Sequence, residues 1–346
     1  MSHLEDIKQY ARSCLADEIP SGQKHKWACQ RFLDDLERVG TADFSYIWSE
    51  DNADKIVKWF SLLKHSKGTL AGKPIDLTMW QKFRACQLYG WIHRETGRKR
   101  FKKSFTEVGR KNAKSQMEAG EALYEIAIQA TKNMETYEVY TAGTKRDQSK
   151  IVFGECNLMT KGSILRSKFN FKRDEIVHIK TGSFIKPLSK EDGKTGDGTN
   201  PACLILDEYH QHPTTDFYDL GLGSNTKEPM LTIITTAGKD LTYPCYTQEY
   251  DYCSKVLDPN VDVKNDEYFI DICEADKGDD PGALETWQKA NPIRAFYDEG
   301  IKKIAEDYEI AKQIPEKMIA FMTKVLNIWL YGYEKMEGLR SQGLPY

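Results

Sequence analysis

Helical periodicity dominates the first ninety-five residues of the chain. Apolar residues recur at helical spacing in three segments, 24–39, 52–64 and 78–94. The first part of this region, up to about residue 40, favours helix as a whole, and residues 68–74 form a turn before the third helix. We therefore expect a helical N-terminal segment over residues 1–95.

From residue 96 the pattern changes to short apolar runs separated by helical stretches. The runs predict strands at 101–108, 138–142, 202–208, 230–236 and 267–273. Helical patterns follow at 117–130 and 144–158, and residues 175–179 with 183–188 predict a hairpin or an edge pair. Strands that alternate with helices favour a mainly parallel sheet flanked by helices. We expect this α/β core over residues 96–270.

The last part of the chain is again helical. Residues 284–314 predict helices with a break at 290–292, and residues 317–330 predict a final amphipathic helix. We expect a helical lid subdomain at 271–335 and a linker at 336–346. The acids Asp276, Asp279 and Asp280 precede these helices, and a solvated acidic loop is preferred there over a metal site.

The segment between the first core strand and the next helix carries the clearest chemistry. A strand, a tight basic turn and a helix that opens with Lys114 and Ser115 are typical of a phosphate-binding loop. The first amides of a helix lack internal partners, so a polyphosphate binds there, with Lys114 on its outer oxygens and Ser115 on Mg²⁺. The usual motif has glycine where Val108 and Ala113 stand. A basic helix start on a solvated face is the alternative.

A second candidate lies about ninety residues downstream, where an apolar run ends in Asp207 and Glu208. Such a run predicts a strand covered on both faces, and its carboxyl end is where open α/β sheets bind ligands. Asp207 would hold Mg²⁺, and Glu208 would deprotonate the water that attacks the γ-phosphate. We expect this pair and Lys114 to meet across adjacent strand ends. An acidic cap on the next helix is the alternative, which the upstream Lys-Ser pair disfavours.

Two further pairs are candidates for nucleotide contacts. Trp80 and Gln81 open the third helix; a glutamine amide can read adenine, and a tryptophan can pack beside the base. The alternative is a core tryptophan and an exposed glutamine. Thr235 and Thr236 end a buried strand, where their hydroxyls would sense the γ-phosphate, and ordinary strand-end chemistry is the alternative.

Composition limits the class of protein. The 346 residues are 40% hydrophobic and 29% charged, with a net charge of −3, which gives no global positive field for nucleic acid. The basic run at 98–103 is read as a solvated face rather than a nucleic-acid contact. No signal peptide and no apolar run of about 18 residues is visible, so we expect neither secretion nor a membrane span. The eight cysteines include no Cys-x-x-Cys pair and show no zinc-ligand spacing, which predicts reduced thiols in a cytosolic protein.

Together these segments resemble the ATPase half of phage large terminases, the motors that package viral DNA. The matching segments are 80–81, 109–115, 204–210, 235–238, 290–292 and 326–329. Their order and spacing cover residues from about 75 to 332. The Arg-Lys-Asn-x-Lys-Ser form of the phosphate loop is particular to this family, which accounts for the missing glycines.

The resemblance implies a P-loop NTPase of the additional-strand catalytic-glutamate type that uses ATP and Mg²⁺. It implies a catalytic role for Glu208, Lys114 and Arg110, metal binding by Ser115 and Asp207, and coupling of hydrolysis to movement by Thr235 and Thr236. The residues that it implies for nucleotide binding are Trp80, Gln81, Gly109, Arg110, Lys111, Asn112, Ala113, Lys114, Ser115 and Gln116.

The resemblance also implies partners. It predicts a homo-oligomeric ring on the procapsid portal, with the isolated chain a monomer as the alternative, and contacts with double-stranded DNA and the small terminase subunit. A neighbouring subunit would supply an arginine finger or another cation, for which Arg146, Lys190 and Lys194 are candidates. The expected location is the cytoplasm of an infected bacterium, without a membrane.

The resemblance predicts ATP-driven translocation of double-stranded viral DNA into a procapsid. Full-length relatives carry an RNase H-like nuclease domain, and we expect that domain to be absent because the chain ends where it would begin. Two alternatives stay open: a helicase-like or other nucleic-acid-remodelling ATPase of the same fold, and a nucleotide-binding scaffold that assembles without turnover.

Overall fold

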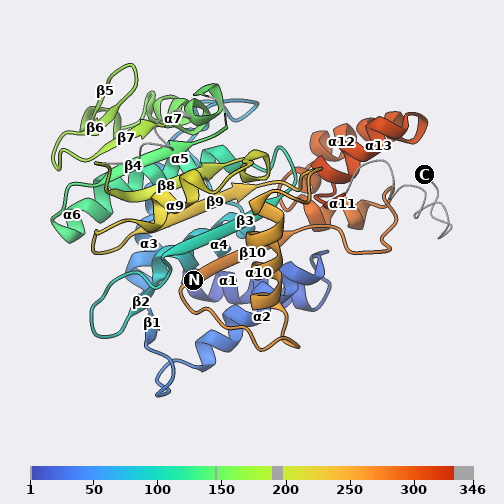
Figure 1. Cartoon of the computed structure of the whole chain (residues 1–346), viewed down its shortest axis with the longest axis horizontal. Coiled ribbons are helices and arrows are strands. Elements are labelled where there is room, and N and C mark those ends of the chain that lie inside the picture. Colours follow the sequence, from blue (N-terminus) through green and yellow to red (C-terminus); the bar gives the residue numbers. More distant parts are fainter. Residues whose placement is uncertain (1, 145, 189–197, 331–346) are drawn as a thin grey trace.

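In the computed structural model, residues 2–144, 146–188 and 198–330 are described, and they are built around a mainly parallel sheet flanked by helices (Figure 1). The strands of this sheet lie in the order β10-β3-β9-β8-β4-β7-β6-β5. Their bounds are β3 (Lys103–Val108), β4 (Glu138–Ala142), β5 (Phe169–Phe171), β6 (Ile176–His178), β7 (Phe184–Pro187), β8 (Pro201–Asp207), β9 (Met230–Thr235) and β10 (Tyr268–Cys273). Neighbours from β10 to β7 are parallel, and β7, β6 and β5 pair antiparallel, which confirms the predicted edge hairpin.

The strand order corrects one expectation about the site. The strands that precede Lys114 and Glu208 are β3 and β8, and β9 lies between them rather than the two being adjacent. Because all three strands are parallel, their carboxyl ends reach the same edge of the sheet. With β9 inserted between β3 and β8, the predicted mainly parallel sheet flanked by helices is confirmed.

Helices cover both faces of the sheet and form a separate lobe at one end (Figure 1). The helices are α1 (His3–Leu15), α2 (Gln23–Glu37), α3 (Glu50–Leu62), α4 (Met79–Gly90), α5 (Lys114–Tyr124), α6 (Ala130–Asn133), α7 (Arg146–Thr160), α9 (Asp216–Leu222), α10 (Asp251–Leu257), α11 (Leu284–Ala290), α12 (Asp298–Gln313) and α13 (Pro315–Lys324). Short 3₁₀ and π segments are η1 (Glu125–Gln129), η2 (Arg166–Lys168), η3 (Tyr209–Gln211), η4 (Cys245–Tyr250) and η5 (Arg294–Phe296).

The alternation of side chains along β8 explains its continuous apolar sequence. Cys203 and Ile205 belong to the core on one face, under α1–α5 and α7, whereas Leu204 and Leu206 belong to the core on the other face, with α9 and α10. A strand buried on both faces has no polar side to show in its sequence. A third core, between α11, α12 and α13, holds the lid lobe together.

Two predicted helices end earlier than expected. The pattern at 78–94 gives α4, which stops at Gly90, and the chain continues as β2 (Trp91–His93) paired with β1 (Tyr46–Trp48). A side chain at Gly90 would meet the ring of Trp48 at 2.9 Å, and Trp48 packs edge-to-face on Trp91. The pattern at 317–330 gives α13, which stops at Lys324 because the following residues bond to other segments.

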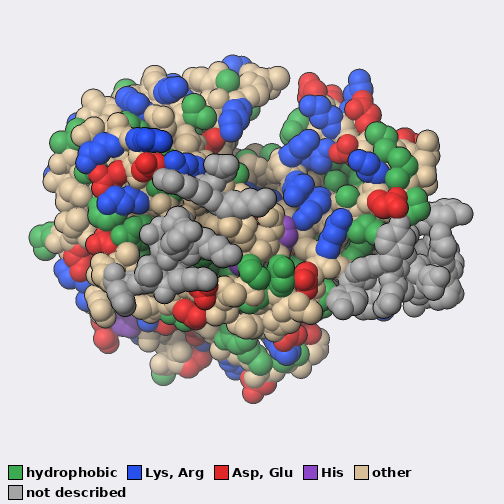
Figure 2. Space-filling model, turned by 45° about the horizontal axis from the view of Figure 1, so that its top comes forward, with side chains coloured by type: hydrophobic (Ala, Val, Ile, Leu, Met, Phe, Trp, Pro, Cys, Tyr) green, Lys and Arg blue, Asp and Glu red, His purple; other side chains and the backbone are tan. Residues whose placement is uncertain are grey.

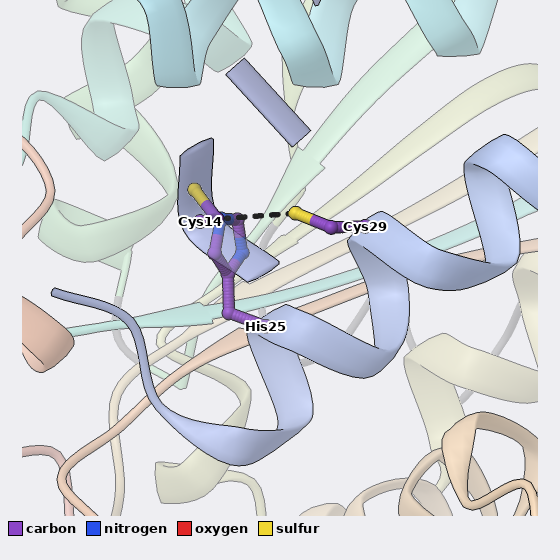
Figure 3. Close-up of side chains that lie close together, drawn as sticks. All are labelled: Cys14, His25 and Cys29. Atoms are coloured by element: carbon purple, nitrogen blue, oxygen red, sulfur yellow. Dashed lines mark hydrogen bonds between the residues drawn. The ribbon is translucent and has the colours of Figure 1, made fainter. Parts of the chain in front are cut away.

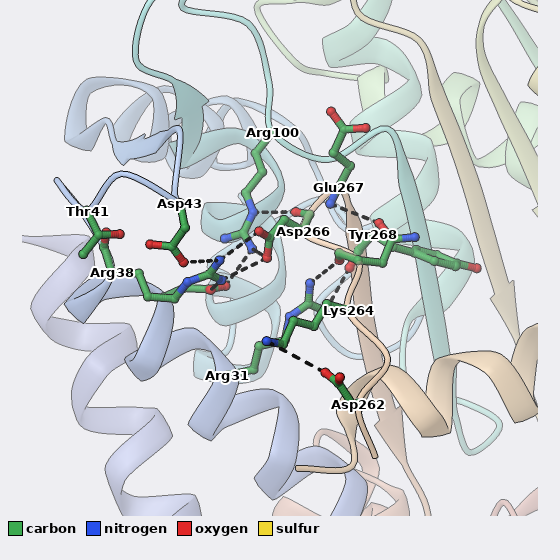
Figure 4. Close-up of polar contacts among 12 residues, drawn as sticks. Arg31, Arg38, Thr41, Asp43, Arg100, Asp262, Lys264, Asp266, Glu267 and Tyr268 are labelled. Carbon is green, nitrogen blue, oxygen red and sulfur yellow. Dashed lines mark hydrogen bonds and ion pairs between the residues drawn. The ribbon is translucent and has the colours of Figure 1, made fainter. Parts of the chain in front are cut away.

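The N-terminal helices are held against the sheet by ion pairs, one of them buried, rather than forming a separate body. Arg38, which directly follows α2, donates to both oxygens of Asp266 at 3.0 Å (Figure 4), and the buried Arg100 lies 2.7 Å from Asp35 of α2. Arg31 donates to the main-chain oxygen of Tyr268 at the start of β10. These contacts hold α2 against the sheet edge formed by β10. None of the helices in the described ranges has the length and apolarity needed to cross a bilayer.

Candidate active site

The phosphate-loop segment lies at the carboxyl edge of the sheet, between β3 and α5. Val108 ends β3 in the core, and Lys114 is the first residue of α5. Between them Lys111 and Ala113 have left-handed backbones, with φ of 68° and 55°. Ala113 therefore adopts the conformation for which the usual motif has glycine, at a cost of about 1–2 kcal/mol. The loop keeps its turn even though the glycine is absent.

Lys114 is buried beside the two acids that were expected to face it. Its Nζ donates to the main-chain oxygens of Val108 at 3.2 Å and Gly109 at 3.4 Å. Burial lowers the pKa of the Lys114 ammonium, and the nearby charges of Glu208 and Asp207 act in the opposite direction. The structure thus brings Lys114, Asp207 and Glu208 into one site across the end of β9.

Asp207 and Glu208 differ in their surroundings. Asp207 is 4% exposed, and its burial, followed by the charge of Glu208, raises the pKa of its carboxyl to about 7. Glu208 begins the turn after β8 with a φ of 51°. Its Oε2 is buried, makes no hydrogen bond within the described residues, and lies 3.2 Å from Nδ1 of His210. One oxygen of the Glu208 carboxylate is therefore left without a hydrogen-bond donor within the described residues.

His210 links the acidic strand end to β9 and to the lid, a role that its sequence did not signal. Its main-chain N–H donates to Thr235 Oγ1 at 3.0 Å, and its Nδ1 lies 3.0 Å from the same oxygen. Its Nε2 accepts from Lys324 Nζ at 3.0 Å. Because Lys324 can only donate, Nδ1 carries the ring proton. Burial, then the charge of Lys324, lowers the pKa of His210 to about 2, so the ring is neutral.

Lys324 is the last residue of α13 and lies far from the other site residues in sequence. It also donates to the main-chain oxygen of Ala237, the residue after Thr236. Burial and the charge of Arg110 lower the pKa of Lys324 to about 8, whereas Glu208 raises it. Thr235 and Thr236 are fully buried, and the Thr236 hydroxyl has no partner within the described part of the chain. The lid therefore places a cation beside the strand ends.

The first part of the phosphate loop, from residue 109 to 112, is hydrogen-bonded to the lid. The amides of Gly109 and Arg110 donate to the main-chain oxygens of Ala290 and Lys324 at 3.0 and 2.8 Å. Asn112 Nδ2 donates to Gly109 O and to Asn291 Oδ1 at 2.8 and 2.9 Å. Asn112 Oδ1 accepts from the amides of residues 293 and 294 at 3.1 and 2.9 Å. The side chain predicted to contact nucleotide is thus used within the protein.

Trp80 and Gln81 lie at the start of α4, next to the lid. Trp80 is 2% exposed, and Gln81 is also buried, with Oε1 accepting from the amide and hydroxyl of Thr78. A cavity of about 490 Å³ opens beside Trp80, whereas Gln81 is not among its lining residues. Its walls come from α1, α2, α4, β10 and the lid, and its lining residues are Tyr10, Ile19, Pro20, Ser21, His25, Thr78, Met79, Trp80, Cys273, Gln288, Lys289, Pro292, Ile293, Phe296 and Tyr297.

The remaining predicted residues are spread around this edge. Ser115 is half-buried in the first turn of α5, and Gln116 Nε2 lies 3.4 Å from Nδ1 of His65. Arg110 and Lys111 are exposed. Figure 2 shows a hollow between the core and the lid lobe, with Lys and Arg side chains gathered on the wall of the lobe. Among the finger candidates, Arg146 begins α7, whereas Lys190 and Lys194 lie outside the described residues, as does the predicted linker at 336–346.

Comparisons with known proteins identify relatives of this chain. Residues 79–255 match a family model described as terminase large subunit, ATPase domain. Protein YmfN of Escherichia coli (strain K12) is 34% identical over 151 residues, which are 41% of this chain and 31% of that protein. The crystal structure of the HK97 bacteriophage large terminase is 22% identical, with a TM-score of 0.64, and the match covers 80% of this chain and 55% of that chain.

A further match is the large terminase of the thermophilic bacteriophage D6E in complex with ADP. It is 8% identical, with a TM-score of 0.46, and the match covers 66% of this chain and 48% of that chain. The chain therefore spans about a third of YmfN and about half of the HK97 protein. The likeness to the HK97 structure shows a shared fold.

Proposed function

Because this chain belongs to the family of terminase large subunit ATPase domains, we propose that it hydrolyses ATP where Lys114, Asp207 and Glu208 converge. The observation that carries this proposal is the buried Lys114 at the start of α5, close enough to Asp207 at the end of β8 and to Glu208 after it for their charges to act on its ammonium pKa. A polyphosphate at the start of α5 would take Lys114 Nζ from the carbonyls of Val108 and Gly109. The negative charge of the polyphosphate would raise the pKa of the Lys114 ammonium, which burial lowers.

The donors beside Lys114 suit Mg²⁺, which prefers oxygen ligands. Ser115 supplies a hydroxyl and Asp207 a carboxylate that is buried with few compensating charges, so that its pKa is raised to about 7. A divalent cation beside this carboxylate would favour its ionised form. Mg²⁺, when bound, would neutralise charge on the phosphate oxygens.

Glu208 is the proposed general base. Its unpaired Oε2 would accept a proton from the attacking water, and the neutral His210 with its proton on Nδ1 would face the same oxygen without competing for that proton. His210 in turn contacts Thr235 and Lys324. A change in charge at Glu208 would therefore reach both β9 and the lid through one side chain.

The cavity beside α4 is the proposed place for the adenine ring. Its lining is largely apolar and includes Trp80, Pro292 and Ile293. Residues 293 and 294 are bonded to Asn112 of the phosphate loop, so the base and the phosphates would be held by one connected unit. Gln81 follows the lining residue Trp80 but does not line the cavity itself; because its carbonyl is used by Thr78, its NH₂ group is the proposed donor to adenine.

For the whole protein we propose a ring on the portal of a procapsid that translocates double-stranded viral DNA. The small terminase subunit would be a partner, in the cytoplasm of an infected bacterium. Lys324 would supply a cation within the subunit, and a neighbouring subunit would add a second from Arg146, Lys190 or Lys194. Stimulation of hydrolysis by portal-bearing procapsids supports this proposal, whereas stimulation by single-stranded DNA alone favours a helicase.

Two substitutions test the site itself. Lys114→Ala and Glu208→Gln should each lower the rate of ATP hydrolysis by about 10²-fold or more, because each removes a group that acts on the reacting phosphate. Glu208→Gln should still bind Mg-ATP. The control is Glu306→Gln, an exposed acid on α12. Near-normal turnover in Glu208→Gln would remove the assigned base.

A further inference from the structure

Side chains of the metal-ligating type meet in the core between α1, α2 and β10. They are Cys14, His25, Cys29, Asp271 and Cys273, and all are buried. The ligand atoms of Cys14, His25 and Cys29 lie within 4.8 Å of one another (Figure 3). Those of His25, Asp271 and Cys273 form a second such group around the same ring. His25 is therefore shared between two thiols on one side and a carboxylate on the other.

The first group has the dimensions of a tetrahedral zinc site. Zinc binds sulfur at about 2.3 Å and nitrogen at about 2.0–2.1 Å, which places those two ligand atoms roughly 3.6 Å apart. Cys29 Sγ lies 3.7 Å from Nε2 of His25. His25 and Cys29 are four residues apart on α2 and so share one face, while Cys14 approaches from the last turn of α1.

The surroundings of His25 complete the arrangement. Its Nδ1 lies 2.6 Å from Oδ1 of Asp271, and the other oxygen of Asp271 accepts from the Trp80 indole at 2.8 Å. A carboxylate behind the ring nitrogen that does not bind metal is the usual partner of a zinc-ligating histidine, since it fixes the ring and its proton. Tyr10 Oη lies 3.0 Å from Nε2 and stands at the remaining position.

We propose that Cys14 Sγ, Cys29 Sγ and His25 Nε2 bind one Zn²⁺, with Tyr10 Oη or a water bonded to it in the fourth position. Two thiolates and an imidazole are a ligand set that zinc prefers. Binding releases the two thiol protons to solvent, and no redox change takes place. Tyr10 and His25 also line the cavity beside α4, which gives the ion a path of entry. The ion would tie α1 and α2 to each other, and Asp271 would tie both to β10.

The spacing of the cysteines along the chain does not show this cluster, because the fold brings its members together. Ten residues separate Cys14 from His25, and the carboxylate partner is Asp271, which lies in another part of the chain. The local signal was His25-x-x-x-Cys29 on one helix face. The fold supplies the rest, because α1 packs against α2 and brings Cys14 to His25 and Cys29.

The test measures metal without nucleotide, so it is independent of ATP hydrolysis. The full chain, purified without chelator, should contain about one equivalent of zinc by mass spectrometry. After removal of metal, titration with Co²⁺ should give thiolate charge-transfer and tetrahedral d–d bands that saturate at one equivalent. Cys14→Ser and Cys29→Ser should lose these bands, while the control Cys86→Ser, a buried thiol on α4, should keep them.

A second measurement covers the case in which the serine variants fail to fold. Thermal unfolding of the unaltered chain and of Cys86→Ser should occur at a higher temperature with Zn²⁺ than with EDTA. An unaltered chain that contains no zinc and shows no cobalt bands overturns the proposal. Cobalt bands of full strength in folded Cys14→Ser or Cys29→Ser would overturn the assignment of ligands.

Discussion

At the scale of single residues, the ionised carboxylate of Asp207 is destabilised by its surroundings in the site. Its carboxyl is buried next to Glu208, and Lys114 offsets only part of this, so its pKa is raised to about 7. The folded chain therefore binds this proton more tightly than the unfolded chain does. Where the group is ionised, it destabilises the folded state until a cation arrives. The site is arranged for a ligand rather than for stability.

Asp207→Asn is expected to stabilise the nucleotide-free protein at pH 8. The pKa of Asp207 is raised from 3.8 to about 7 in the folded state. Ionisation of this carboxyl therefore destabilises the folded state progressively between about pH 4 and pH 7, by at most about 4 kcal/mol. The melting temperature of the variant should therefore exceed that of the parent at pH 8, and the difference should shrink toward pH 4. Asp262→Asn, at a side chain that is 96% exposed, is the control. Equal melting temperatures at pH 8 would contradict the assignment.

Two substitutions in the phosphate loop should act in opposite directions. Ala113→Gly removes the cost of a left-handed alanine, so it should raise stability by up to about 1 kcal/mol and leave ATP hydrolysis intact. Gly109→Ala places a Cβ 2.7–2.9 Å from atoms of Asn291, Val325 and Ala290, which forces the lid away and should lower both stability and turnover. Denaturant unfolding and phosphate release measure the pair. A destabilised Ala113→Gly would show that the loop conformation is misassigned.

At the scale of elements, the seam between the phosphate loop and the lid is the most important contact. Gly109, Arg110 and Asn112 all bond to residues 290–294 or 324. Asn291 completes the seam by donating to the main-chain oxygens of Trp287 and Val325. Because Gly109, Asn112 and Asn291 are buried, breaking these bonds leaves polar groups without partners, so movement of the lid and movement of the loop are not independent.

Asn112→Ala should release the lid from the loop. The change removes the acceptor of the amides of residues 293 and 294 and the donor to the Asn291 side-chain carbonyl, so we expect a loss of about 2–3 kcal/mol in the free energy of unfolding. Hydrogen exchange should accelerate in residues 284–330, and Mg-ATP should bind more weakly. Asn260→Ala, at an exposed loop residue, is the matched control. Unchanged exchange in the lid would count against the seam.

Element types were readable from the sequence, but several of their ends were not. Apolar runs located β4, β8, β9 and β10 closely, because burial on both faces leaves a local pattern. The end of α4 at Gly90 depends on the ring of Trp48, and the end of α13 depends on Asn327, which bonds to Ala237 and Cys273. Such partners are distant in sequence, so periodicity does not reveal them.

The candidate site shows the same division. The Lys-Ser helix start and the Asp-Glu strand end were visible as local motifs, and the structure places them together. The role of Lys324 and its link to His210 were not visible in the sequence. Lys324 belongs to the lid and reaches His210 only through the fold. The intervening β9 and the cluster around His25 likewise depend on topology rather than on spacing.

At the scale of the whole molecule, the lid presents a cation to its own site, while an assembled ring would add another from a neighbour. If a neighbour's cation is needed, the rate per subunit should rise with protein concentration, because a cation supplied in trans can contribute about 10³-fold or more. Phosphate release measured across a wide range of concentrations tests this. A rate per subunit that is high and independent of concentration would contradict it.

Lys324→Ala distinguishes the contribution to turnover of the cation within the subunit from that of a cation supplied by a neighbour. The substitution should lower turnover by about 10²-fold at every protein concentration, because it removes a donor beside the strand ends. Lys312→Ala, on the exposed side of α12, is the control and should leave the rate unchanged. An effect of Lys324→Ala that disappears at high concentration would place its role in assembly instead.

The most direct test is a crystal structure of the chain with Mg²⁺ and a non-hydrolysable ATP analogue. We predict Lys114 Nζ on the outer phosphates, Ser115 and Asp207 around the metal, and a water between Glu208 and the γ-phosphate. Triphosphate bound away from the start of α5, or a Glu208 carboxylate turned from the γ-phosphate, would contradict the account.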